Sequence, residues 1–268
     1  MCRLLGYLGS PLPLEKLLYQ PEHSLIVQSY QPKEMNVAIL NADGFGMGWY
    51  DSVEEAPPYT YKNTIPIWHD LNLPQLSRYV ESPCMLGYVR SATPGLPVDF
   101  SNTQPFTHDN WLFFHNGFIQ NFRDTLYLKI RQALNDTSYQ WIQGNTDSEH
   151  IFAMVLDEVA KNPQLSKELA LGKVISQLAH WSELLQVPLA INLLMSNGKQ
   201  LIASRYGKHV SSPSLYWLKN DLNFPQGVII ASEPLFEGNW NRCPESSIIS
   251  VGEDLEVNIS DIPARVYS

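Results

Sequence analysis

Helical periodicity in this chain is clearest in its middle part, and strand-like segments lie on both sides of it. Apolar residues recur at helical spacing after residue 121, again over 151–159 and again over 171–178. Apolar stretches bounded by turn residues lie at 2–8, 44–50, 84–92, 111–119, 188–196, 200–206, 214–219, 227–232 and 246–251. Because helices and sheets must bury their apolar faces against one another, this order predicts an α+β fold, with helices packed outside one or two largely antiparallel sheets.

Several of the strand-like segments are apolar on successive residues, so these strands are expected to be covered on both faces. Two proline-rich segments, 54–66 and 91–106, are expected to form long loops. Loops held on a rigid scaffold often carry functional residues. A chain of 268 residues is long enough to bury a sizeable core in one large domain or two small ones.

Charge and cysteine usage exclude several classes of function. The net charge is −9, and the sequence has no run of Lys or Arg that could bind along a phosphate backbone. Neither nucleic acid nor an anionic membrane is therefore an expected partner. The three cysteines show no C-x-x-C spacing, the histidines form no metal motif, and the glycines of "GFGMGW" lack the dinucleotide-binding spacing. We therefore expect no cofactor and no metal. The apolar stretch after Arg3 is too short for a signal peptide, which indicates the cytoplasm.

Cys2 directly follows the initiator methionine, and loss of Met1 would leave its thiol beside a free α-amino group. An ordinary thiol has a pKa of ~8.5 and an α-amino group one of ~8, so the amine can accept the thiol proton near neutral pH. One residue would then supply both nucleophile and base. The alternative is that Cys2 is a small buried side chain at the start of a strand.

A thiolate that attacks an amide needs donors for the oxyanion and a grip on the substrate. Asn116 and Gly117 end the strand-like "FFHNGFI": the Asn amide can donate, and Gly allows its backbone N–H to approach closely. Asn-Gly is also a common hairpin turn. Arg90 ends an apolar strand and needs an anionic partner, either a substrate carboxylate or a structural salt bridge.

Asp147 lies in "NTDSEH", where Thr146 and Glu149 have the spacing of a capping box that starts a helix. The first turn of a helix favours an ionised carboxylate. Asp147 is therefore suited to bind a substrate ammonium, or it simply compensates the helix dipole.

Six motifs in series, "MCRLLGYLG", "NADGFGMGWY", "RSATPG", "NTQPF", "HNGFIQN" and "NTDSE", resemble class II glutamine amidotransferase domains. The likeness extends to "ASEPLFEGNW" and is particularly clear with the γ-glutamyl hydrolases of ergothioneine biosynthesis. The resemblance implies an N-terminal nucleophile hydrolase with an αββα sandwich, formed by a single domain over residues 2–268.

The resemblance also implies roles for the matching positions. Cys2 would form a γ-glutamyl thioester, and Asn116 with Gly117 would make the oxyanion hole. Arg90 would hold the α-carboxylate of the glutamyl group and Asp147 its α-ammonium. The substrate would be a small γ-glutamyl amide, such as the γ-glutamyl conjugate of hercynylcysteine sulfoxide.

Thr93 matches a substrate-lining position of the family. Glutamine-dependent synthases read "THG" where this chain has "TPG", and they carry histidines where this chain has Gln104 and Phe106 on either side of Pro105. These positions are expected near the leaving group, so the γ-glutamyl half of the substrate is better defined than the departing half.

Three alternative functions stay open at the level of sequence. In the first, the chain is a glutaminase subunit that passes ammonia to a separate synthase, which requires a partner protein. In the second, the chain cleaves glutathione at its γ-glutamyl bond. The third belongs to another class: a catalytically silent binding or scaffold protein, which predicts a retained Met1 or a blocked Cys2. A homo-oligomer is compatible with each.

Overall fold

The structure is a computed structural model that describes residues 2–34, 40–51, 56–92 and 97–263. Its strands form two antiparallel sheets. The first has the order β11-β9-β10-β1-β4-β2-β3 and the second the order β13-β12-β8-β7-β6-β5. The first sheet consists of β1 (Arg3–Pro13), β2 (Phe45–Trp49), β3 (Tyr59–Asn63), β4 (Glu81–Val89), β9 (Tyr216–Asp221), β10 (Phe224–Ala231) and β11 (Asn241–Arg242). The second consists of β5 (Phe106–His108), β6 (Trp111–Ile119), β7 (Leu189–Ser196), β8 (Leu201–Lys208), β12 (Ser247–Val251) and β13 (Val257–Asp261).

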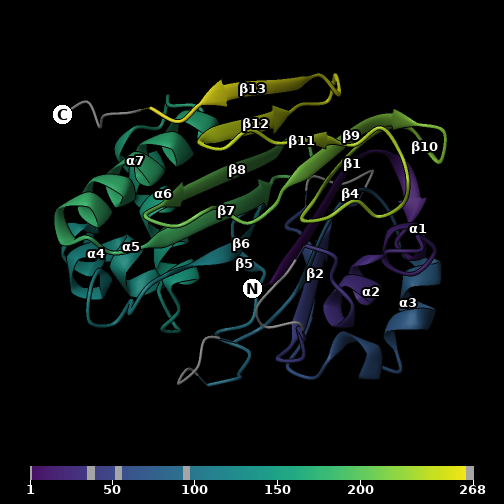
Figure 1. The fold of residues 1–268 in the computed structure, drawn as a ribbon, viewed down its shortest axis with the longest axis horizontal. Coiled ribbons are helices and arrows are strands. Elements are labelled where there is room, and N and C mark those ends of the chain that lie inside the picture. Colours follow the sequence, from purple (N-terminus) through teal and green to yellow (C-terminus); the bar gives the residue numbers. More distant parts are fainter. Residues whose placement is uncertain (1, 35–39, 52–55, 93–96, 264–268) are drawn as a thin grey trace.

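Helices cover the outer face of each sheet, which gives an αββα arrangement (Figure 1). On the first sheet lie α1 (Glu15–Leu18), α2 (Leu25–Tyr30), the 3-10 turn η1 (Ile67–His69) and α3 (Leu73–Tyr79). On the second lie α4 (Tyr127–Ala133), α5 (Asp136–Trp141), α6 (Asp147–Lys161) and α7 (Lys167–Leu185). The α+β prediction is confirmed, and all the predicted strand segments are found.

Alternation along β1 places the residues of the N-terminal segment. Leu5 and Tyr7 belong to the core between the first sheet and the helices α1, α2 and α3. Cys2, Leu4 and Leu8 belong to the core between the two sheets. Successive side chains of a strand point to opposite faces, so this division follows from the period of two. Cys2 is therefore directed between the sheets, at the end where β1 begins.

The two sheets approach closely because glycines face the opposite layer. A Cβ at Gly46 on β2 would lie 1.9 Å from the carbonyl oxygen of Gln104, and one at Gly48 would lie 2.5 Å from Leu112. No side chain fits at these distances. Gly46 and Gly48 of "GFGMGW" thus allow close packing between the sheets.

The segment 54–66 differs from the predicted long loop, because β3 forms within it as an edge strand paired with β2. Its prolines flank the strand, where no ladder hydrogen bond is lost, and the strand needs only one partner. The short helices α1, α2, α3 and α5 were not predicted either. Each has seven residues or fewer, too few to show a repeated apolar stripe.

Candidate active site

The sulfur of Cys2 lies between the ends of two strands of the first sheet. The Cys2 side chain is only 7% exposed. Its Sγ accepts a hydrogen bond from the Tyr88 hydroxyl at 2.9 Å and another from the Ser91 backbone N–H at 3.4 Å. In the antiparallel register of β1 and β4, Leu4 lies opposite Tyr88 and Arg3 opposite Val89. The start of β1 and the end of β4 therefore enclose the thiol.

Arg3 fixes the backbone of Cys2 from the other face of β1. Its Nη1 donates to the Cys2 carbonyl oxygen at 2.8 Å. Its Nε lies 3.0 Å from Glu233 Oε1, which makes an ion pair, although the N–H does not point along the line to that oxygen. Both side chains are buried. Burial of this kind is tolerated only when the charges are paired, so the position of Cys2 is tied to Glu233.

Glu233 follows the end of β10 and gathers several donors. His23 Nε2 lies 2.7 Å from Glu233 Oε2, and the backbone N–H groups of Lys33 and Glu34 donate to the carboxylate at 2.7 and 3.2 Å. Burial alone would raise the pKa of Glu233. The hydrogen bond to His23, the charge of Arg3 and the backbone donors outweigh burial and hold the pKa below its usual value. Glu233 therefore stays ionised as the counter-charge of Arg3.

Asn116 and Gly117 lie on β6, in the second sheet, and Ser232 connects Asn116 to β1. The Asn116 Nδ2 lies 3.4 Å from Ser232 Oγ, which also accepts the Leu4 N–H at 2.9 Å. Asn116 is fully buried, and its Oδ1 has no hydrogen-bond partner among the described residues. A Cβ at Gly117 would lie 1.9 Å from the Ala190 carbonyl oxygen, so only glycine fits. The alternative of a plain Asn-Gly hairpin turn is wrong, because both residues lie inside β6.

Arg90 follows directly after β4, and extending the register of β1 and β4 by one residue brings it opposite Cys2. It is 4% exposed. Its Nη1 donates to the Asp43 carbonyl oxygen over a long 3.4 Å, and no carboxylate of the described residues forms an ion pair with it. Of the two partners considered for Arg90, the structural salt bridge is thus absent from the part of the chain that the structure describes. The charge of Arg90 helps to lower the pKa of the Asp99 carboxyl, but the two side chains form no direct ion pair. A buried guanidinium without an ion-pair partner is costly unless a ligand supplies one.

Asp147 lies in the first turn of α6, which Thr146 caps as predicted, by accepting the Glu149 N–H at 3.2 Å. One Asp147 oxygen accepts the Ile119 N–H at the end of β6 and the other accepts the Ser148 N–H, each at 2.8 Å. The carboxylate is thus held between β6 and α6 by backbone donors.

The capping box is only half formed. The Glu149 carboxylate does not reach back to Thr146 but accepts the N–H groups of Gln143 and Gly144, at 2.8 and 2.7 Å. It orders the loop that precedes α6 and so supports the position of Asp147.

Cys2, Arg90 and Asp147 all act electrostatically on one residue, Tyr88. Burial raises the pKa of the Tyr88 phenol well above its usual value, Cys2 and Asp147 raise it further, and Arg90 opposes them. The structure therefore brings the predicted thiol, cation and carboxylate to the same end of the sandwich, with Asn116 joined through Ser232. Thr93 lies outside the described residues.

Several residues of this region were not found by sequence reasoning, among them Arg3, Tyr88, Ser232 and Glu233. Tyr88 shares a strand face with Arg90, two positions away, and this alternation is a usable signal. Glu233 is a charged residue that ends an apolar strand, which is the same feature that drew attention to Arg90. Ser232 gives no signal of its own in the sequence.

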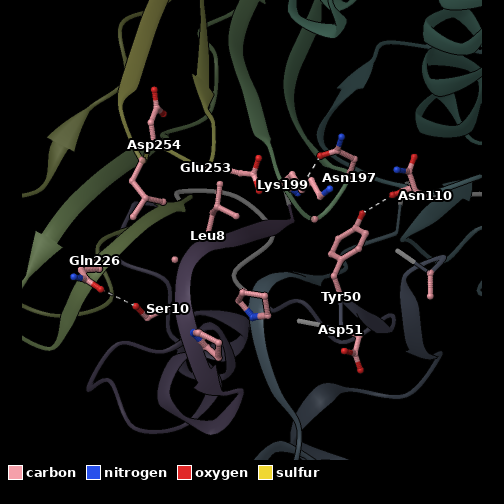
Figure 2. Close-up of a pocket in the computed structure, with 16 residues that line it drawn as sticks. Leu8, Ser10, Tyr50, Asp51, Asn110, Asn197, Lys199, Gln226, Glu253 and Asp254 are labelled. Atoms are coloured by element: carbon pink, nitrogen blue, oxygen red, sulfur yellow. Dashed lines mark hydrogen bonds between the residues drawn. The ribbon is translucent and has the colours of Figure 1, made fainter. Parts of the chain in front are cut away.

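A cavity of about 1210 Å³ lies at the other end of β1, away from Cys2. Its lining includes Leu8, Ser10, Tyr50 and Gln226, and turns from both sheets surround it (Figure 2). The Tyr50 hydroxyl points to the Asn110 carbonyl oxygen, to which it donates at 2.9 Å. None of the predicted site residues lines this cavity.

Within the described residues, no cluster of three or more His, Cys, Asp or Glu side chains is arranged to hold a metal ion. No helix there has both the length and the apolar character needed to cross a membrane.

Two facing antiparallel sheets between helical layers, with a cysteine leading the first central strand, define the class of N-terminal nucleophile amidotransferase folds. The model of the class-II glutamine amidotransferases matches residues 16–213. The chain therefore belongs to the class-II glutamine amidotransferase family.

Relatives and solved structures agree over nearly the whole chain. The γ-glutamyl-hercynylcysteine sulfoxide hydrolase of Mycobacterium tuberculosis is 32% identical over 94% of this chain and 93% of its own length. That of Mycolicibacterium smegmatis is 30% identical over 94% of this chain and 96% of its own. The solved structure of a glutamine aminotransferase class-II domain protein from Silicibacter pomeroyi has a TM-score of 0.72 at 26% identity, and covers 97% of this chain and 98% of that one.

Proposed function

We propose that this protein is a cysteine-dependent amidohydrolase that cleaves a γ-glutamyl amide bond and releases glutamate. The observation that carries the proposal is Arg90: a buried guanidinium opposite Cys2 with no carboxylate partner among the described residues. A γ-glutamyl group presents one α-carboxylate and one α-ammonium at its far end. Arg90 binds the first through a forked pair of hydrogen bonds, and Asp147 binds the second.

The nucleophile is the Cys2 thiolate, formed after removal of Met1 when the α-amino group takes the thiol proton. The sulfur attacks the γ-carbonyl carbon, and negative charge develops on the carbonyl oxygen. The C–N bond then breaks, and the α-ammonium of Cys2 gives its proton to the departing amine. Water attacks the thioester, the S–C bond breaks, and glutamate leaves as the thiol is restored.

Asn116 and the Gly117 N–H are the proposed oxyanion donors, and the contact with Ser232 supports this role. The oxygen and the nitrogen of an Asn side-chain amide have nearly the same shape, so the hydrogen bonds around them decide which atom is which. With the Asn116 amide reversed, the Ser232 hydroxyl donates to Oδ1, and Nδ2 takes the position that now has no partner. A donor fixed in a water-excluded site is well placed to stabilise developing charge.

The proposed substrate is a γ-glutamyl conjugate of hercynylcysteine sulfoxide, because relatives about one-third identical over most of their length carry that name. Thr93 is proposed to line the site near the leaving group. We place the enzyme in the cytoplasm, acting on a small soluble substrate, without nucleic acid or membrane partners.

A panel of γ-glutamyl amides tests this function, with glutamate release as the readout. It should contain the hercynylcysteine sulfoxide conjugate, glutamine and glutathione. We expect the conjugate to have the highest kcat/KM and the Cys2→Ala variant, correctly folded, to be inactive on all three. A preference for glutamine would favour the ammonia-donating alternative, and activity retained in Cys2→Ala would overturn the proposal.

A further inference from the structure

Tyr88 places its hydroxyl on the sulfur that the proposed mechanism uses. The residue lies on β4, is 3% exposed, and packs against Phe114 of the opposite sheet at a ring distance of 5.9 Å. Its hydroxyl donates to Cys2 Sγ at 2.9 Å. Because the ring is held between the two sheets, the hydroxyl has little freedom to choose another partner.

The phenol remains a donor throughout the neutral pH range. Burial first, and the neighbouring Cys2 second, raise the pKa of Tyr88 well above its usual value of ~10. Together with the Ser91 N–H, the hydroxyl gives the sulfur two donors from the same strand end. A donated hydrogen bond stabilises a charged acceptor more than a neutral one.

We propose that Tyr88 is a catalytic residue whose phenol donates a hydrogen bond to the Cys2 thiolate and thereby stabilises it in both halves of the reaction. In the first half the bond stabilises the thiolate that attacks the substrate. In the second, water attacks the thioester carbon, the S–C bond breaks, and the sulfur departs as a thiolate that the phenol receives. This inference rests on the proposed function, since it assigns a partner to the same nucleophile.

Charged groups that act on either partner of this hydrogen bond must be held constant in a test. Arg3 on β1 interacts with Cys2, whereas Arg90 after β4 and Asp147 on α6 act on Tyr88. The α-amino group of the mature Cys2 is a further charge. Tyr88→Phe leaves all of them in place and removes a single oxygen atom. Tyr50→Phe is the matched control, because Tyr50 is buried in the same core between the sheets but bonds to Ser196 and Asn110.

The experiment follows alkylation of Cys2 by iodoacetamide across pH, with mass spectrometry of the N-terminal peptide. Buried Cys84 and Cys243 serve as unreactive references. For Tyr88→Phe we expect the pH of half-maximal alkylation to rise by about one unit or more, and kcat/KM at neutral pH to fall about 10–100-fold. Tyr50→Phe should change neither. Incorporation of 3-fluorotyrosine at position 88 makes a stronger donor and should move the midpoint downward.

A folded Tyr88→Phe protein with the wild-type alkylation profile would overturn the inference, as would an unchanged profile for the fluorinated protein. If the proposed function itself is wrong, a different result is expected. In that case Cys2→Ala would hydrolyse γ-glutamyl amides as well as the wild type, whatever Tyr88 does.

Discussion

Two buried arginines at this site should respond to the same substitution in opposite ways. Arg3 is paired with buried Glu233 and bonds the Cys2 carbonyl, whereas Arg90 makes one long bond to a backbone carbonyl and no ion pair among the described residues. Methionine keeps much of the length of either side chain and removes the charge. Comparing Arg3→Met with Arg90→Met therefore distinguishes an arginine that stabilises the fold from one that binds a ligand.

The sizes of the two effects follow from these contacts. Removing one partner of a buried ion pair costs ~3–5 kcal/mol, and the lower end applies to Arg3→Met because His23 and two N–H groups still serve Glu233. At about 2–4 °C per kcal/mol, Tm should fall by about 6–12 °C. Arg90→Met removes a buried charge that has no ion-pair partner in the part of the chain that the structure describes, so Tm should stay unchanged or rise.

For substrate binding, Arg90→Met should have a larger effect than Arg3→Met. Hydrogen bonds between charged groups contribute roughly 1.5–3 kcal/mol, so loss of the Arg90 fork should raise KM for a γ-glutamyl amide about 10–100-fold. Glutamate at one hundred times its Kd stabilises a folded protein by about 2.7 kcal/mol, and Arg90→Met should lose this protection.

Thermal denaturation with and without glutamate, together with initial-rate kinetics, measures all of these quantities. The reasoning is refuted if Arg90→Met loses as much stability as Arg3→Met, because Arg90 would then have a structural partner. Retained protection by glutamate in Arg90→Met would refute it equally.

Two further predictions concern the scaffold of the site. Gly117→Ala should abolish activity and cost at least ~1–3 kcal/mol, because its Cβ would meet the Ala190 carbonyl oxygen at 1.9 Å; Gly252→Ala, with nothing closer than 3.4 Å, should be neutral in urea unfolding. Burial lowers the pKa of His150 to about 4, so the unfolded chain takes up this proton near pH ~6.5 and the folded chain only near 4. Stability should therefore fall by about 3 kcal/mol as pH drops through this window, and His150→Gln should flatten that loss; an equal slope in both proteins would contradict the assignment.

The layered fold was predictable because long elements carry their periodicity openly. The strand β7 reads as an apolar run interrupted by Asn192 and is buried along its whole length, and α6 and α7 show clear apolar stripes. The edge strand β3 was not predictable in this way. Its aromatic and polar residues lie between prolines, and its pairing with β2 depends on a neighbour that only the assembled sheet provides.

Candidate site residues could be predicted from the sequence where the type and position of a single residue indicate its chemistry. Cys2 carried its own base, whereas Arg90 and Asp147 each called for an oppositely charged partner, and the three residues lie at one end of the sandwich. The links between them could not be read from the sequence, because Arg3 and Glu233 are 230 positions apart and meet only when β1 pairs with β10. The single domain over 2–268 and the role of Thr93 stay predictions.

The most direct measurement of the central claim is the mass of the N-terminal peptide after trapping with a γ-glutamyl amide. Acid quenching during turnover preserves a thioester, and peptide mass spectrometry then locates it. The account predicts that the mature chain begins at Cys2, without Met1, and that a γ-glutamyl group is attached to its sulfur. A fully active protein that retains Met1, or a glutamyl group attached to any other residue, would contradict the account.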